Sequence, residues 1–361
     1  MKTLENIYNP KDNSFDLLRF TLAYAVLIYH SYILLGTGHD IFTNYFKNIT
    51  LGTFAVGGFF ALSGFFITAS FLNTDNFISY LKKRLLRIIP AFLVSLLLII
   101  FIIVPIASSQ EINYFSLEKD TPLYFLLNSI FFHIFNYSWS VNGVFEFLPF
   151  PNSLNGSMWT LKHEFAAYLI MPLILVLAFK NRVGFLLTSL VIVILAILNV
   201  LFSYKIFNFP CCSMWVFSSN EYNSFILFFS FFLIGSNLYL FKDKVILSYR
   251  LVLVFIFLIF ISNKYQGPTL IFLMLFLPYI LIYVGSVFKY KFFTKYGDYS
   301  YGVYIYAFPL QQFLIYLYYE NLTIGRFIFL ASVITLIISI LSWHLIEKNF
   351  LKMKRLKNAK N

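Results

Sequence analysis

Long runs of apolar residues follow one another along the whole chain, and each is close to 20 residues long. A helix needs about 20 mostly apolar residues to cross a bilayer. The runs cover roughly residues 15–36, 51–72, 88–107, 157–179, 184–203, 223–241, 250–263, 268–287, 300–319 and 325–346. Because they are continuous rather than alternating, they exclude a β-barrel. Charged residues make up 12% of the chain, against roughly 25% in soluble domains. The sequence predicts an all-α, polytopic integral membrane protein of about ten transmembrane helices, with residues 1–361 as one membrane-embedded domain and no soluble domain.

The basic residues predict how the helices are oriented. The net charge is +12, but Lys and Arg occupy short segments between apolar runs, which is typical of topology signals rather than of nucleic-acid binding. With a cytoplasmic N-terminus, most of them fall on the cytoplasmic side. The exceptions are Lys47, Lys119, Lys162, Lys205, Lys264 and Arg326. This distribution predicts cytoplasmic N- and C-termini and no nucleic-acid partner.

Two connections on the outer side are long, at residues 108–156 and 204–222. The first is rich in aromatic residues, so we expect it to pack onto the helices as an extracytoplasmic lid. Aromatic faces often hold sugars, and anchoring at the membrane interface explains the composition equally well. In the second connection, Cys211 and Cys212 are adjacent, which predicts neither a disulfide framework nor a metal site.

The first apolar run carries two ionisable side chains, Arg19 and His30. Ionisable groups inside a membrane span are costly and mark candidate functional sites. Eleven residues separate these two, which places them on one helix face about 16 Å apart. Arg19 suits an anionic group, and His30 suits proton transfer. The alternatives are an anchoring Arg19 paired with Asp16, and a core His30 bonded to a backbone carbonyl.

A basic cluster precedes the third apolar run and contains Arg84 and Arg87. At a spacing of three residues, both side chains lie on one face of a helix. Two guanidinium groups at the cytoplasmic surface can clamp phosphates. Contact with anionic membrane lipid is the alternative, and composition alone favours it.

The start of the fourth run combines a turn with polar and aromatic residues. Ser157 belongs to the turn that enters the helix, and Trp159 fits an interfacial belt. Glu164 lies about two turns inside, where a carboxylate needs a partner or a proton. Because Lys162 and His163 do not share its helix face, we expect its partner on another helix.

Taken in order, these segments resemble the acyltransferase family 3 of integral membrane proteins, from Asp16 to about Phe350. The matching segments are Asp16-x-x-Arg19 followed by His30, Gly58-Phe59-Phe60-Ala61-Leu62-Ser63-Gly64-Phe65, Arg84-x-x-Arg87-Ile88-Ile89-Pro90, Ser157-Met158-Trp159-Thr160-Leu161-Lys162-His163-Glu164, Tyr299-Ser300-Tyr301-Gly302-Val303-Tyr304 and Ile346-Glu347-Lys348. Three positions depart from the family pattern. This chain has Tyr306 where the family often has a histidine, Asn349 where it often has a proline, and Thr160 where serine is common.

The resemblance implies an enzyme that O-acylates, usually O-acetylates, an extracytoplasmic glycan or a lipid-linked saccharide. The implied donor is cytoplasmic acyl-CoA, usually acetyl-CoA, and the implied location is the cell's inner or plasma membrane, surrounded by lipid. The resemblance assigns catalysis to His30, as general base or as acyl carrier. It assigns donor binding to Arg19, Arg84 and Arg87. We add Glu164 as a candidate catalytic residue, and Ser157 and Trp159 as candidate acceptor-binding residues.

A transporter of an anionic or sugar substrate is the alternative function, because several helices with buried charges also suit a carrier. Such a carrier predicts inverted repeats and broken helices near mid-span. The sequence contains no internal repeat.

Overall fold

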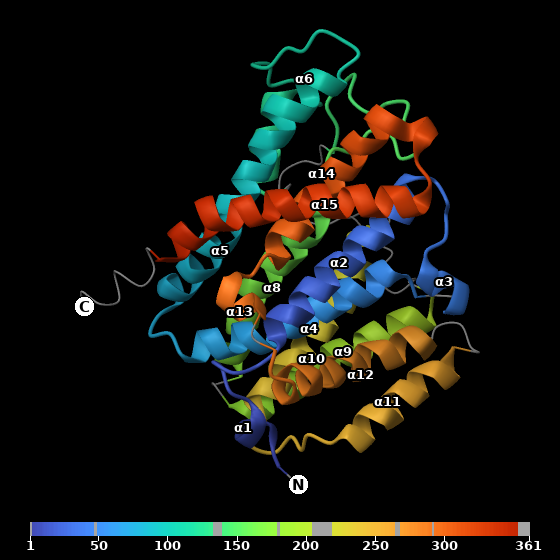
Figure 1. Ribbon diagram of the computed structural model, residues 1–361. Helices are drawn as coiled ribbons and strands as arrows, with labels where there is room; N and C mark the ends of the chain where they lie inside the picture. The colour runs from blue at the N-terminus through green and yellow to red at the C-terminus, as the bar shows by residue number, and fades with distance from the viewer. Residues whose placement is uncertain are drawn as a thin grey trace. The chain divides into compact units, whose positions relative to one another are not determined.

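The structure, a computed structural model, describes residues 2–46, 49–132, 139–178, 181–203, 219–263, 268–290 and 292–352. Within these ranges the regular structure is helical, apart from isolated bridges between single residues. The longer helices are α2 (Phe15–Leu34), α4 (Leu51–Leu72), α5 (Phe77–Leu98), α7 (Pro122–Ile130), α8 (Met158–Leu177), α9 (Arg182–Leu201), α10 (Ser219–Leu240), α11 (Tyr249–Ser262), α12 (Pro268–Val287), α14 (Ser300–Tyr318) and α15 (Ile324–Ser342) (Figure 1). The predicted all-α class is confirmed. Cys211 and Cys212 lie outside the described residues.

Short helices complete the described structure. They are α1 (Leu4–Ile7), α3 (Ile41–Tyr45), α6 (Val104–Ala107), α13 (Phe292–Tyr296), the 3₁₀ helix at Tyr319–Asn321, and two π-helical segments at Ile99–Ile103 and Trp343–Glu347. The first π-helical segment joins α5 to α6, and the second extends α15.

Every predicted apolar run contains a helix. Among the described residues, eight helices are long and apolar enough to cross a membrane, which fits a polytopic membrane protein. With 14 residues, α11 is shorter than these. Although α14 has 19 residues, its glutamines and tyrosines make it less apolar, and it is not among the eight. The count of about ten spans and the cytoplasmic termini remain predictions.

The helix that contains the third apolar run is longer than the run. The run begins at residue 88, after the basic cluster, whereas α5 begins at Phe77 and includes Arg84 and Arg87, which confirms that both arginines lie on a helix. Charged side chains lower hydropathy without interrupting a helix, because arginine and lysine are good helix formers. The arginines therefore lie on a rigid helix, on the turns that lead into Pro90.

The chain divides into two compact units. The first consists of residues 1–22, 41–80 and 163–295, and the second of residues 23–40, 81–162 and 296–361. Among the described residues, four helices, α2, α5, α8 and α13, contribute residues to both units.

Small residues allow α4 and α10 to approach closely in the first unit. A Cβ atom built on Gly64 would lie 1.9 Å from the Phe232 carbonyl oxygen, and one built on Gly235 would lie 2.0 Å from that of Ala61. The Ser236 hydroxyl donates a hydrogen bond to the Gly64 carbonyl at 3.2 Å. The two backbones are thus in direct contact, as expected for the small residues of the second apolar run.

The second unit is built around α14, most of whose residues are buried. The Tyr306 hydroxyl donates to Ser342 at 3.0 Å, which fixes α14 to the end of α15. Tyr301 donates to the Ile88 carbonyl at 3.0 Å, which fixes the start of α14 to α5. This unit also contains the connection at residues 108–156, whose Phe132 ring stacks on Phe92 of α5 with centroids 5.6 Å apart. Described residues of this connection therefore pack onto a helix of the second unit, and their role as an extracytoplasmic lid stays a prediction.

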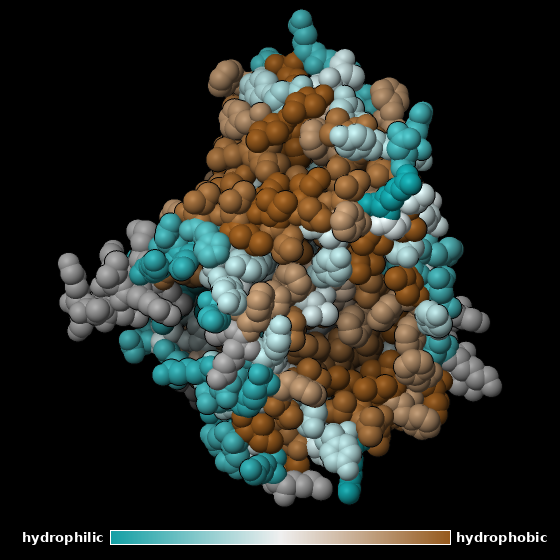
Figure 2. Space-filling view, in the orientation of Figure 1, coloured by the Kyte–Doolittle hydropathy of each residue, from teal (hydrophilic) through white to brown (hydrophobic). Residues whose placement is uncertain are grey.

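Apolar side chains cover the outer face of α15. Phe329, Ile337 and Leu341 are more than half exposed, and Figure 2 shows hydrophobic residues over this helix. Large exposed apolar surfaces on a soluble protein are unusual. They suit a helix whose outer face meets lipid.

Candidate functional site

His30 lies on α2 within the second unit and is half-buried. Its imidazole packs edge-on against the Phe308 ring of α14, with centroids 5.0 Å apart. Its Nδ1 atom is buried and has no hydrogen-bond partner among the described residues. Buried polar atoms are normally paired. One imidazole nitrogen is therefore an exception to this rule within the described part of the chain.

Phe308 also contacts the turn that precedes α8. A Cβ atom built on Gly156 would lie 2.5 Å from Cε2 of Phe308, so the ring fits there because residue 156 is glycine. The Asn155 side chain caps the turn by accepting from the Ser157 amide at 3.0 Å, and it donates to the Ile305 carbonyl at 3.1 Å. One aromatic ring thus meets His30 and the turn that carries Ser157.

Ser157, predicted to bind the acceptor, is buried in this turn. Its carbonyl accepts hydrogen bonds from the hydroxyls of Thr160 and Tyr304, at 3.1 Å and 3.3 Å. Its own hydroxyl is buried without a hydrogen-bond partner in the described part of the chain. Trp159 follows in the first turn of α8 and is half-buried. The sequence-predicted turn and helix start are confirmed.

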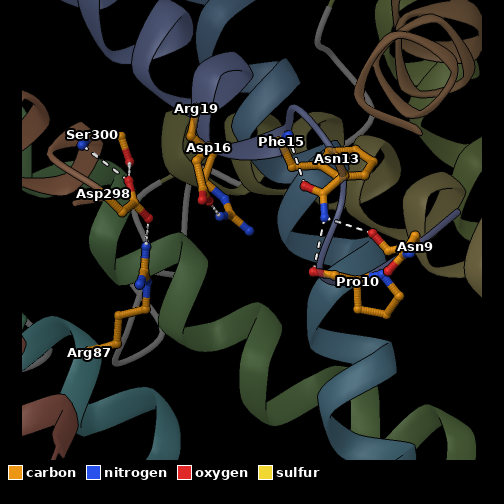
Figure 3. A network of polar contacts seen from close by, with 9 residues as sticks. All are labelled: Asn9, Pro10, Asn13, Phe15, Asp16, Arg19, Arg87, Asp298 and Ser300. Carbon is orange, nitrogen blue, oxygen red and sulfur yellow. Dashed lines mark hydrogen bonds and ion pairs between the residues drawn. The ribbon is translucent and has the colours of Figure 1, made fainter. Parts of the chain in front are cut away.

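Arg87 forms an ion pair with Asp298, which lies just before α14 (Figure 3). The Asp298 carboxylate also accepts from the Ser300 amide at 3.2 Å and from the Ser300 hydroxyl. Asp298 is buried, whereas about a third of the Arg87 side chain is exposed. Arg84 lies one turn earlier on α5 and is half-buried. Asp298 was not predicted from the sequence, although an acidic residue two positions before a predicted helix is a recognisable capping signal.

Tyr299 sits beside this ion pair at the N-terminus of α14. Burial raises the pKa of its hydroxyl above the ordinary value. The hydroxyl donates a hydrogen bond to the Tyr296 carbonyl at 3.1 Å.

The helix α14 joins the two parts of the site in the second unit. Its first residue, Ser300, belongs to the Arg87 ion-pair network, and Phe308 packs on His30. Eight residues separate Ser300 from Phe308 along this helix, which is about 12 Å of axial rise. The Arg87 guanidinium thus lies near the start of α14, and the His30 imidazole packs on the same helix further along.

Arg19 belongs to the first unit. It forms the predicted ion pair with Asp16 at 2.9 Å (Figure 3). Its guanidinium lies 4.5 Å from the centroid of the Phe66 ring of α4. Both charged side chains are about three-quarters buried. An arginine that already balances a carboxylate and lies on an aromatic face is oriented before any ligand arrives.

Glu164 also belongs to the first unit and is half-buried on α8. Its carboxylate accepts from the Ser63 hydroxyl of α4 at 2.9 Å, so the expected partner on another helix is confirmed. It also accepts from the Tyr168 hydroxyl one turn further along α8, which the sequence-based reasoning did not identify. Ser63 belongs to the small-residue segment of the second apolar run, and it connects that segment to the carboxylate.

The predicted site residues are therefore divided between the two units. The second unit contains His30, Arg84, Arg87, Ser157 and Trp159, and the first contains Arg19 and Glu164. A single unbroken helix, α2, carries both Arg19 and His30.

Comparison with known proteins identifies the family. The family described as "Acyltransferase domain" matches residues 12–344, which is nearly the whole chain. The chain belongs to this acyltransferase family. The acyltransferase is also similar to an "O-acetyl transferase" of Shigella phage Sf6, with 28% identity over 360 residues that cover 94% of this chain and 96% of that protein. No solved structure matches the acyltransferase.

Proposed function

We propose that this membrane acyltransferase is an O-acetyltransferase of the cell's inner or plasma membrane. It transfers an acetyl group from cytoplasmic acetyl-CoA to a hydroxyl of an extracytoplasmic glycan or lipid-linked saccharide. The family match and the similarity to a phage O-acetyl transferase support this proposal. The observation that carries it is the half-buried His30, whose Nδ1 has no hydrogen-bond partner among the described residues.

The proposed reaction uses His30 as a general base. A sugar hydroxyl is a poor nucleophile until its proton is removed. As the imidazole takes that proton, the hydroxyl oxygen attacks the thioester carbonyl carbon. The tetrahedral intermediate then collapses, the C–S bond breaks, and the departing thiolate of CoA takes the proton from the imidazolium. Both products are neutral at the reacting atoms, and His30 is regenerated.

The arginines form the proposed donor-binding residues. CoA carries several phosphate negative charges, and guanidinium groups bind phosphate through paired, charge-assisted hydrogen bonds. Arg84 and Arg87 lie on the same helix, and Asp298 orients Arg87. The neutral pantetheine arm would then extend along α14 toward His30. Arg19 is proposed to contribute a further contact with the donor, oriented by Asp16.

The acceptor is proposed to bind at the turn before α8. The Ser157 hydroxyl is buried without a described partner and can pair with a sugar hydroxyl. Trp159 provides an aromatic face for the sugar ring. Glu164 is proposed to assist catalysis through its hydrogen bonds with Ser63 and Tyr168.

A transfer assay tests the proposal directly. Membranes that contain the protein receive [¹⁴C-acetyl]-CoA, and the surface glycan and lipid-linked saccharides of the host are extracted. We expect alkali-labile label on one of these saccharides, and an O-acetyl signal that is missing from cells without the protein. Uptake of a sugar or anion into vesicles with no labelled saccharide would contradict the proposal and support a carrier.

Replacing Arg87 with alanine is expected to raise the KM for acetyl-CoA roughly 10- to 100-fold, because charge-assisted hydrogen bonds contribute about 1.5–3 kcal/mol. The kcat should change much less, because Arg87 binds the donor away from the reacting carbon. Steady-state kinetics with varied acetyl-CoA measures both constants.

The matched control is Arg182→Ala, which removes another arginine–aspartate pair. Arg182 pairs with Asp243 at 2.8 Å, with 45% of the Arg182 side chain exposed, in the first unit. This variant should keep the wild-type KM for acetyl-CoA. An equal rise of KM in both variants would show that the effect of Arg87 is not local.

A further inference from the structure

Gln311 is a buried amide inside a helix of a membrane protein. It lies on α14, and its side chain is completely buried. Its Nε2 atom donates to the Leu27 carbonyl at 2.9 Å and to the Ser31 hydroxyl at 2.7 Å, both on α2. Its Oε1 atom is buried and has no hydrogen-bond partner among the described residues. Such an acceptor costs free energy unless a donor reaches it.

The orientation of this amide is determined by its neighbours. The nitrogen and oxygen of a side-chain amide have similar shapes, so the hydrogen-bond network is used to decide which atom occupies which position. The Leu27 carbonyl has no proton to donate, so the group that meets it must be the NH₂ of Gln311. Rotating the amide would place two oxygens in contact. The unpaired atom is therefore the oxygen, and it is an acceptor that awaits a donor.

Gln311 contacts the part of α2 that carries His30. Its two partners on α2 lie close to His30 in the chain, Ser31 next to it and Leu27 one helical turn before it. On α14, Phe308 is one turn before Gln311, and its ring packs on the imidazole at 5.0 Å. Two buried polar atoms without described partners, Nδ1 of His30 and Oε1 of Gln311, thus belong to one contact region between α2 and α14 within the second unit.

From this arrangement we infer that Gln311 recognises the acceptor and selects which of its hydroxyls is acetylated. The inference rests on the proposed function. Sugars carry neighbouring hydroxyls, each a hydrogen-bond donor. When one hydroxyl gives its proton to His30, its neighbour donates a hydrogen bond to Oε1 of Gln311. The acceptor therefore has at least two adjacent hydroxyls. The amide oxygen of Gln311 binds one of them and so determines which hydroxyl faces the His30 imidazole.

The test compares the position of the acetyl ester on the surface glycan of the host in cells that carry wild type, Gln311→Met or Gln312→Met. Methionine keeps the length of glutamine but removes both hydrogen-bonding atoms. For Gln311→Met we expect at least a roughly tenfold lower ratio of ester at the wild-type hydroxyl to ester at other positions, because one hydrogen bond to the acceptor is lost. NMR of the purified glycan measures this ratio.

Gln312→Met is the matched control for loss of a buried amide. Gln312 is also fully buried, but its Nε2 donates to the carbonyls of Phe150 and Ser153 instead of to α2. Its loss should lower the amount of protein or product without moving the ester. A wild-type ester position in Gln311→Met, or the same shift in both variants, would overturn the inference.

A second variant keeps the test decisive if Gln311→Met does not accumulate in the membrane. Gln311→Leu also removes both hydrogen-bonding atoms and is apolar, so its product should show the same shift of the ester, and an ester on the wild-type hydroxyl would overturn the inference. Failure of the proposed function is a separate result, because wild type would then add no O-acetyl group to any saccharide.

Discussion

Replacing His30 with alanine is expected to reduce acetyl transfer by roughly 10²- to 10⁴-fold, the usual contribution of a positioned general base. The protein should still fold. Nδ1 of His30 has no described hydrogen-bond partner, so its removal leaves no other described group unpaired. The main structural loss is the edge-on contact with Phe308, and such contacts contribute about 0.5–1.5 kcal/mol. Transfer of [¹⁴C]acetyl to the glycan measures the loss of activity, and elution from a size-exclusion column shows whether the protein is still folded.

His39→Ala is the matched control for the loss of a histidine. His39 is exposed and follows α2 in the same unit, so its replacement should leave transfer unchanged. Undiminished acetylation of the glycan by the His30→Ala protein would refute the assignment of His30. Incubation with labelled acetyl-CoA without acceptor separates the two possible roles. Label that is bound to wild type but not to His30→Ala indicates an acyl carrier, and its absence indicates a general base.

The second large effect is expected for Gly64→Ala, which acts on stability rather than on chemistry. The new methyl group would lie 1.9 Å from the Phe232 carbonyl oxygen, and that oxygen is backbone and cannot rotate away. The helices α4 and α10 must therefore separate, which also breaks the hydrogen bond from Ser236 to the Gly64 carbonyl. Overpacking typically costs 1–3 kcal/mol, and a backbone contact should reach at least about 3 kcal/mol. The thermal transition in detergent should fall by several degrees or more, with a loss of monodisperse protein.

Gly325→Ala is the control for adding a methyl group to a helical glycine. Gly325 lies in the first turn of α15, and a Cβ atom there would meet nothing within 4 Å. Its replacement should leave the transition unchanged or raise it slightly, because alanine is the better helix former. If Gly64→Ala melted at the same temperature as this variant, the close contact of α4 and α10 would be contradicted.

Several parts of the site could be predicted from the sequence because they depend on local rules. A helix that contains both Arg19 and His30 follows from a single apolar run, and the Asp16 ion pair follows from a three-residue spacing. The turn before α8 follows from its polar residues. The partner of Glu164 was expected on another helix because its neighbours in the chain point elsewhere, and Ser63 fulfils that expectation.

Other parts depend on residues that are far apart in the chain. Arg87 and Asp298 are more than 200 positions apart, and their pairing depends on how α5 packs against the start of α14. Phe308 and Gln311 are an ordinary aromatic residue and an ordinary amide in a predicted span. Their contacts with His30, Gly156 and Leu27 make them candidates for the proposed site.

The sequence by itself determined that the chain is helical and membrane-embedded, because hydrophobic length and backbone hydrogen bonding allow few other solutions in lipid. It also determined which ionisable groups are costly enough to suggest a function. Only the tertiary structure decided which polar atoms are paired and which lack a partner in the described part of the chain. Pairing requires two groups within about 3 Å, and helix packing rather than local sequence brings distant side chains to that separation.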